Sequence, residues 1–208
     1  LCPHLLLAEI IKLDYEGFTV WLDCEKRGAI KFRYNAQRDT GSFKRKSSFY
    51  IDQNIPTYCQ QTSTKSYGKP YERGHLVPAN HLDHSKKAIK QSNFITNILP
   101  QHRNINHGAW YKTEVITECY RDIDDLLVIG GVIWGEGKEE VLSHKVKIPE
   151  AFWKVIIRGG INDTQAIAWV IPNLSNAKRS ALDDYIVTIS DIEELTGEII
   201  PVPEYVKH

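Results

Sequence analysis

The chain has 208 residues, of which 42% are hydrophobic and 25% charged, as is ordinary for a soluble globular protein that buries a sizeable core. Its 26 basic and 26 acidic residues cancel, so the general positive field of a tight, non-catalytic nucleic-acid binder is missing. Basic residues cluster only locally, most informatively at residues 44–46. No apolar stretch is long enough to span a membrane, so no membrane partner is expected.

The four cysteines are spaced too irregularly for a metal knuckle; they are Cys2, Cys24, Cys59 and Cys119. One or two disulfides, or four buried thiols, fit the spacing equally well. The sequence contains no Met, even at its first position, which we interpret as a processed mature chain and as favouring a secreted or periplasmic location. Residues 5–11 are apolar and are predicted to form a helix that packs on the core.

The first half of the chain begins with a predicted β-hairpin. Residues 17–23 and 29–34 alternate between apolar and polar side chains and are separated by a short turn. Residues 35–70 are polar, with scattered Gly, Ser, Thr and Pro, as is typical of a long functional or mobile excursion. Residues 81–91 have helical character.

Residues 106–121 are the strongest helix candidate. At about 100° per residue, five side chains are expected to share one face: Asn106, Trp110, Thr113, Glu114 and Thr117. Asn106 stands where an N-cap residue would, at the positive end of the helix. Trp110 is predicted to pack in the core behind this end.

The second half is rich in predicted strands. Residues 126–133 are almost wholly apolar, as expected of a central strand buried on both faces. Residues 152–157 and 166–171 flank a turn that contains Gly, Asn and Asp, which predicts a second hairpin. A short strand at 185–189 and a helical turn at 191–195 follow. The pattern predicts an α+β fold with a central, mostly antiparallel β-sheet flanked by helices.

Side chains suited to catalysis crowd between residues 70 and 120. Arg73 and His75 lie in residues 71–76, Tyr-Glu-Arg-Gly-His-Leu. Residues 92–101, Ser-Asn-Phe-Ile-Thr-Asn-Ile-Leu-Pro-Gln, and residues 106–110, Asn-His-Gly-Ala-Trp, follow. Arg can hold a phosphate, His can activate water, and a neutral Asn can anchor a mostly hydrated divalent cation. The combination indicates hydrolysis of a phosphodiester.

The order of these motifs resembles the DNA/RNA non-specific endonuclease family of the ββα-metal (His-Me finger) nuclease superfamily. That family's signature is Asp-Arg-Gly-His, then Ser-Asn-(Ile/Val)-x-Pro-Gln, then Leu-Asn-x-x-(Ile/Ala)-Trp. Residues 17–23, 146–155, 171–173 and 192–197 are similar to its strands and closing elements. The resemblance implies a single endonuclease domain over residues 1–208, with a ββα-metal finger active site.

The resemblance also implies a role for each matching position. His75 would be the general base that deprotonates water for in-line attack at phosphorus, and an unperturbed pKa of about 6.5 would suit this role. Asn106 would be the one direct protein ligand of Mg²⁺, or of Mn²⁺ in its place. Glu114 would orient a metal-bound water. Arg73 would grip the phosphate, and Asn97 would position the substrate or His75.

The implied substrates are DNA and RNA, cleaved to 5′-phosphate and 3′-hydroxyl ends without selection for the sugar. Sequence preference is not expected, because no base-reading helix or basic arm is evident. An inhibitor protein is an expected partner if the chain is a delivered nuclease toxin. Mitochondrial enzymes share this fold, so a mitochondrial location is the alternative to export.

Three positions depart from the family pattern. Glu72 replaces Asp, which keeps the charge but moves the carboxylate by about a bond length. Leu99 stands where a small polar residue is common. Glu118 occupies the place, one turn after Glu114, where some members carry an Arg that contacts the phosphate. Four other cations could contact the phosphate in place of this Arg, and the sequence does not decide among them: Arg121, Lys112, Arg45 and Lys46.

Two other interpretations remain open. A nuclease-fold binding or interaction protein with impaired catalysis is compatible with Glu118, although His75 and Asn106 are both retained. A zinc hydrolase built on His81 and His84 would predict stoichiometric zinc in the purified protein.

Overall fold

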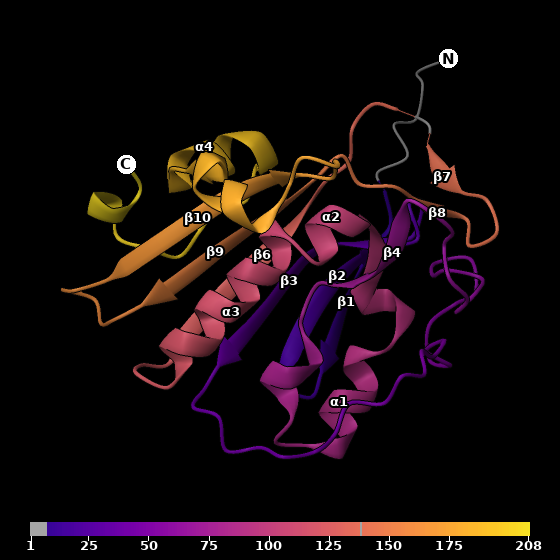
Figure 1. The fold of residues 1–208 in the computed structure, drawn as a ribbon, viewed down its shortest axis with the longest axis horizontal. Helices are drawn as coiled ribbons and strands as arrows, with labels where there is room; N and C mark the ends of the chain where they lie inside the picture. The colour runs from indigo at the N-terminus through magenta and orange to yellow at the C-terminus, as the bar shows by residue number, and fades with distance from the viewer. Residues whose placement is uncertain (1–7, 138) are drawn as a thin grey trace.

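The computed structural model describes residues 8–137 and 139–208, and its largest element is a seven-stranded β-sheet (Figure 1). Every strand pairs antiparallel with its neighbours. From edge to edge the strands are β1 (Ile10–Tyr15), β2 (Phe18–Asp23), β3 (Gly28–Ala36), β6 (Leu126–Ile133), β9 (Ala151–Arg158), β10 (Gln165–Pro172) and β11 (Ile186–Val187). The predicted α+β fold with a mostly antiparallel central sheet is confirmed.

Both predicted hairpins are present, as the β2–β3 and β9–β10 pairs. The apolar run at 126–133 is β6, the central strand of the sheet. Its two faces are buried in different clusters, because Val128 packs on one side of the sheet and Ile129 on the other. An uninterrupted apolar sequence is therefore what this position requires.

Three local predictions need correction. The part of the predicted 5–11 helix that is described does not form a helix but leads into β1, whereas residues 1–7 lie outside the described residues. The helical stretch at 81–91 is divided into a 3₁₀ turn, Ala79–Leu82, and helix α1, Lys86–Ser92. Ser85 causes this division, since its hydroxyl accepts hydrogen bonds from the first backbone N–H groups of α1.

The helix predicted over 106–121 is two helices, α2 (Arg103–Asn106) and α3 (Ala109–Arg121). Gly108 separates them with φ −108° and ψ −116°, and a Cβ there would lie 1.9 Å from the carbonyl oxygen of Asn104. Asn106 therefore ends α2 and is not the N-cap of α3. Trp110, Thr113 and Thr117 do share the buried face of α3, as predicted.

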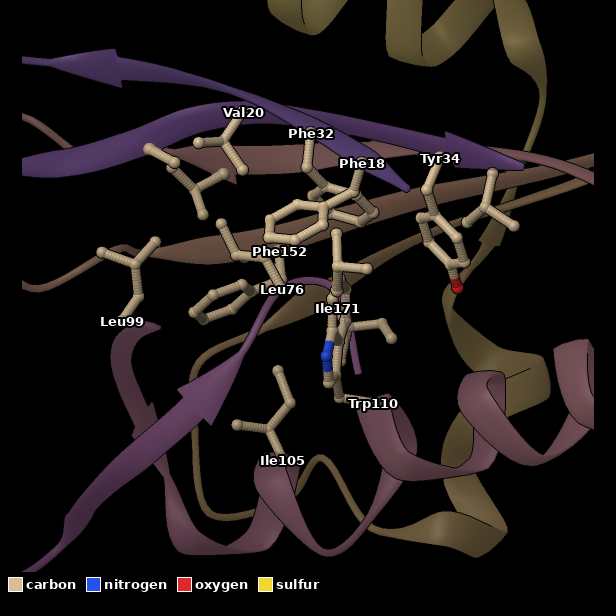
Figure 2. Close-up of a cluster of buried hydrophobic side chains, with 14 of the residues drawn as sticks. Phe18, Val20, Phe32, Tyr34, Leu76, Leu99, Ile105, Trp110, Phe152 and Ile171 are labelled. Carbon is tan, nitrogen blue, oxygen red and sulfur yellow. The ribbon is translucent and has the colours of Figure 1, made fainter. Parts of the chain in front are cut away.

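A smaller antiparallel pair, β4 (Tyr71–His75) and β5 (Ile98–His102), precedes α2 and contains the Tyr-Glu-Arg-Gly-His motif. Together β4, β5, α2 and α3 form the ββα unit, which lies over one face of the large sheet (Figure 1). Its apolar side chains point into the sheet: Leu76, Leu99, Ile105 and Trp110 meet Phe18, Phe32 and Phe152 in one cluster (Figure 2). Removing a buried aromatic side chain such as Trp110 typically costs about 3–5 kcal/mol, so this cluster holds the unit in place.

The opposite face of the sheet is covered by helix α4 (Ile189–Thr196) and the C-terminal segment. Ile189, Ile192 and Ile200 are buried there, and Gly197 ends α4 with φ 71°. A minor pair, β7 (Glu140–Val141) and β8 (Val146–Lys147), projects from the end of β6. The remaining helical segments are short 3₁₀ turns at Ile95–Asn97, Arg179–Tyr185 and Glu204–Val206.

One disulfide, Cys24–Cys59, ties the end of β2 to the long excursion across a sequence separation of 35. Closing a loop of this length stabilises the native state by about 4 kcal/mol in the chain-entropy model. Cys119 is an exposed free thiol, and Cys2 lies outside the described residues. Among the described residues, no helix combines the length and apolar character needed to cross a bilayer.

Candidate functional site

The candidate active site lies where β4 meets the end of α2 and the loop formed by residues 44–49. A cavity of about 500 Å³ opens here, and its lining residues are Arg45, Lys46, Ser47, Phe49, Ser66, Glu72, Arg73 and Asn106. Three of these side chains are cations and one is a carboxylate, so the cavity is suited to an anionic ligand with a bound cation. Arg45 and Lys46 contribute positive charge from the 44–49 loop. They are two of the four cations considered as replacements for the Arg that is missing at the Glu118 position.

His75 lies at the end of β4, 8% exposed, beneath the 44–49 loop. Its Nε2 atom is 2.8 Å from Oδ1 of Asn93, and the Nδ2 of Asn93 donates to the carbonyl oxygen of Lys46 at 2.9 Å. This second bond assigns the orientation of the Asn93 amide, because only Nδ2 can donate. Nε2 of His75 must then carry the proton that it donates to Oδ1, which leaves Nδ1 as the basic atom.

Burial lowers the pKa of His75 to about 3, and the nearby Arg45 charge acts in the same direction. The expectation of an unperturbed pKa was therefore wrong. The sequence could not show that Phe49 covers the ring, with their centroids 5.6 Å apart. His75 is consequently a neutral imidazole near neutral pH, which is the state that a general base requires.

Glu72 of β4 contacts both Asn106, at the end of α2, and His107, which follows it. Its Oε2 accepts a hydrogen bond from Nδ2 of Asn106 at 2.9 Å and lies 2.6 Å from Nε2 of His107. Because Nδ2 of Asn106 is engaged, Oδ1 of that side chain is the atom left for a cation. The glutamate that departs from the family's Asp therefore keeps a defined function here, which is to orient Asn106.

The residues fit a divalent ion of the Mg²⁺ type. Asn106 offers a neutral oxygen beside a cavity wide enough for a cation that keeps most of its waters. Within the described parts of the chain, no three His, Cys, Asp or Glu side chains are grouped to hold a metal. His81 is also engaged, since its Nδ1 is 2.8 Å from the Tyr34 hydroxyl, and the zinc interpretation is therefore not supported.

Glu114 lies on α3, close enough to Lys154 of β9 and to Arg45 of the 44–49 loop for their charges to affect one another. Burial raises the pKa of Glu114 to about 7, although the Lys154 and Arg45 charges oppose this rise. Lys154 is fully buried; its Nζ donates to Oγ1 of Thr113 at 2.8 Å and lies 3.7 Å from the centroid of the Trp110 ring. Burial lowers the pKa of Lys154. The charge of Glu114 opposes this fall, whereas the hydrogen-bond partner of the ammonium is the Thr113 hydroxyl.

Arg73 is partly committed to the protein. One terminal nitrogen donates to the carbonyl oxygen of Thr64 at 2.7 Å, and the guanidinium lies 4.2 Å from the centroid of the Phe49 ring. The rest of the guanidinium lines the cavity, where a phosphate would lie. Asn97, in contrast, is fully buried and bonds only backbone groups, at Val77 and Ser92. It can therefore position the end of β4 but cannot contact the substrate.

Glu118 does not face the cavity, and neither does the cation beside it. Arg121 donates to Glu118 at 2.7 Å and lies 3.1 Å from Asp39, so its charge is used within the protein. Lys112 is exposed on α3 and does not line the cavity. Of the four open candidates, only Arg45 and Lys46 border the site.

Two functional side chains were missed in the sequence. Asn93 belongs to the quoted Ser-Asn motif, but nothing in its spacing predicts a contact with His75 across 18 residues. Lys154 interrupts an otherwise apolar run from Ala151 to Ile157 in β9. Such a lysine is a signal in the sequence, because Lys is almost never fully buried without a partner.

The sequence and the fold of this chain both resemble known proteins. The family model for the DNA/RNA non-specific endonuclease matches residues 8–206. The human mitochondrial nuclease EXOG is 28% identical over 165 residues, which are 72% of this chain and 45% of that protein. Human mitochondrial Endonuclease G is 26% identical over 200 residues, covering 88% and 66% of the two chains. Nuclease C1 of Cunninghamella echinulata var. echinulata is 26% identical over 163 residues, covering 73% and 65%.

A solved chain from the crystal structure of the EndoG/EndoGI complex shares the fold, with a TM-score of 0.78 at 18% identity. The match covers 91% of this chain and 84% of that one. Against the EXOG relatives, this chain spans about half of their length. A family model that extends over almost every residue decides the assignment: the chain belongs to the DNA/RNA non-specific endonuclease family.

Proposed function

We propose that the protein is a metal-dependent, sugar-non-specific endonuclease that hydrolyses phosphodiester bonds of DNA and RNA, and that residues 1–208 form one endonuclease domain. The observation that carries the proposal is the state of His75. Asn93 holds its Nε2–H, and no hydrogen bond in the described structure engages Nδ1. A neutral imidazole with a free Nδ1 can take a proton from water beside a cationic cavity.

In the proposed reaction, Arg73 binds a non-bridging oxygen of the scissile phosphate, with Arg45 and Lys46 from the 44–49 loop beside it. Nδ1 of His75 accepts a proton from the attacking water as the water oxygen bonds to phosphorus and the bond from phosphorus to the 3′ oxygen breaks. Negative charge develops on the phosphoryl oxygens, and the departing 3′ oxygen takes up a proton from solvent. Asn106 would hold Mg²⁺ or Mn²⁺ through Oδ1, and such an ion stabilises this charge and the departing 3′ oxygen. The products carry 5′-phosphate and 3′-hydroxyl ends.

Digestion of plasmid DNA and of an RNA transcript by the purified protein, with Mg²⁺ or with EDTA, tests this function. The expected result is cleavage of both polymers with Mg²⁺ and none with EDTA, with 5′-phosphates identified by their removal with phosphatase. Cleavage of only one polymer would refute the lack of sugar preference. Binding of nucleic acid without cleavage under any divalent ion would favour the catalytically impaired interaction protein.

The biological setting is also a proposal. The Cys24–Cys59 disulfide favours an oxidising compartment, which supports a secreted or periplasmic protein. The EXOG and Endonuclease G relatives are mitochondrial by name, and they keep a mitochondrial location as the alternative. The EndoG/EndoGI complex supports an inhibitor protein as a partner, as a delivered toxin would need.

The acid limb of the pH–rate profile should follow Glu114, not His75. Since burial puts the pKa of Glu114 at about 7 and that of His75 at about 3, lowering the pH from 8 protonates Glu114 first. Protonated Glu114 cannot orient a metal-bound water, so kcat should fall below a pH of about 7. In Lys154→Met the opposing positive charge is lost, which raises the pKa of Glu114 and moves the limb to higher pH.

The profile of kcat against pH for wild type, Lys154→Met and Lys12→Met checks this expectation. Lys12 is an exposed lysine of β1, so its replacement should leave the limb in place. A limb that stays unmoved in Lys154→Met would contradict the assignment to Glu114.

A further inference from the structure

A second cationic cavity, of about 390 Å³, lies beside the candidate active site. Its lining residues are Arg103, Asn104, His107, Gly108, Lys178 and Arg179. Three of them are permanent cations, and none of the six is acidic. Because α2 supplies one wall and the segment before the Arg179–Tyr185 turn supplies the other, residues more than seventy positions apart in the sequence form it together.

The segment that carries Lys178 and Arg179 is anchored to the active-site helices. The backbone N–H of Ala109 donates to the carbonyl oxygen of Ala177 at 3.1 Å, and Nδ2 of Asn104 donates to the backbone carbonyl oxygen of Ser175. Nε of Arg179 donates to the carbonyl oxygen of His107 at 2.9 Å. A side chain at Gly108 would collide with the carbonyl oxygen of Ala177, since its Cβ would lie 2.4 Å away. These contacts fix the 175–179 segment against α2 and the start of α3, so the two walls of the cavity are held together.

Its cations are available for a ligand. Arg179 stacks 4.5 Å from the centroid of the Tyr111 ring, and no carboxylate of the described structure pairs with Arg179 or Lys178. Arg103 meets a carboxylate only at 3.8 Å, where its Nε approaches Glu72. Arg121 is different, since two carboxylates within about 3 Å already neutralise it.

The cavity continues the active site on the α2 side. His107 lines it and contacts Glu72, and Glu72 holds Asn106 in the active-site cavity. A polymer whose scissile phosphate lies at Asn106 must carry its next phosphates outward from there. The 44–49 loop bounds one side of the active-site cavity. The second cationic cavity adjoins the active-site cavity where Glu72 contacts Asn106 and His107.

We infer that the cavity formed by Arg103, Lys178 and Arg179 binds a backbone phosphate of the polynucleotide strand next to the scissile one. The inference rests on the proposed function and names a further binding site for the same substrate. Arg fits phosphate through two parallel hydrogen bonds, and an anchored guanidinium loses little freedom when it binds. Contacts of this type carry no base information, as a non-specific enzyme requires.

Two variants test the inference, the double variant Lys178→Ala/Arg179→Ala and the matched control Lys12→Ala/Arg33→Ala. The control removes the same charge from exposed positions on β1 and β3. Affinity for a labelled oligonucleotide is measured by fluorescence anisotropy in EDTA, over a series of salt concentrations. We expect the double variant to bind about ten-fold more weakly and the slope of log Kd against log salt to fall by about two, with the control unchanged.

Hydrolysis of bis(p-nitrophenyl) phosphate, which has only one phosphate, separates a binding site from a structural role. The double variant should keep the wild-type kcat and KM for this substrate while its KM for the oligonucleotide rises. Equal loss on both substrates, or unchanged affinity and salt slope, would overturn the inference. A wild type that binds the oligonucleotide but hydrolyses nothing would refute the proposed function, while the anisotropy comparison would still decide on the phosphate site.

Discussion

Replacement of His75 by alanine should lower kcat on DNA and RNA by about a thousand-fold, with little change in KM. The imidazole packs against Phe49, a residue of the cavity lining, and Asn93 holds its Nε2, so that no hydrogen bond of the described structure engages Nδ1. Without it, water must lose its proton to solvent. In the proposed mechanism the cations Arg45, Lys46 and Arg73 of the cavity bind the substrate, and the substitution leaves them in place.

Steady-state kinetics of His75→Ala, with and without added imidazole, checks this expectation. Partial recovery of kcat by imidazole would identify the missing group as the base. His84→Ala is the matched control, because His84 is an exposed histidine outside the cavity and its loss should change neither constant. Activity that survives in His75→Ala but is lost in His84→Ala would reject the mechanism.

Asn93→Ala belongs in the same series. It leaves the imidazole present but removes the acceptor that selects its tautomer. A loss of about ten- to hundred-fold in kcat is expected, smaller than that of His75→Ala, because Asn93 acts only by orienting the imidazole. Equal losses in the two variants would mean that orientation, not the base itself, limits the rate.

Asn106→Ala is the second substitution with a large expected effect. At a Mg²⁺ concentration that saturates wild type, kcat/KM should fall by about two to three orders of magnitude. Glu72 engages Nδ2 of Asn106 and leaves Oδ1 for a cation, so in the proposed mechanism the substitution removes the direct ligand. Because waters supply the other ligands, higher Mg²⁺ should restore part of the rate.

Metal titrations of activity separate this effect from a folding defect. Glu72→Gln should raise the Mg²⁺ concentration for half-maximal activity by about ten- to hundred-fold, since the supporting carboxylate of Asn106 loses its charge. Glu194→Gln on α4 removes the same charge from the far face of the sheet and should leave the titration unchanged. If Asn106→Ala shows the wild-type metal dependence, the ion does not bind at this position.

Much of the sheet could be predicted from local patterns. The β2–β3 hairpin alternates between apolar and polar residues, and β6, β9 and β10 are mostly apolar runs. Patterns of this kind favour strands over helices. The β4–β5 pair was not predicted as strands. Its partners are separated by α1, and the residues of β4 are mostly polar, so the pairing depends on contacts that no local period records.

The sequence by itself determined the class of chemistry, because His75, Arg73, Asn106 and Glu114 are residue types that only a narrow set of reactions needs together. It also determined the α+β class of the fold. Only the tertiary structure decided the pKa values, the His75 tautomer and the orientation of these side chains. Burial and a loop cation lower the pKa of His75, Asn93 selects its tautomer, and Gly108 divides the helix so that Asn106 meets Glu72. Desolvation, hydrogen-bond direction and local charge depend on neighbours far apart in the chain, and no sequence motif encodes them locally.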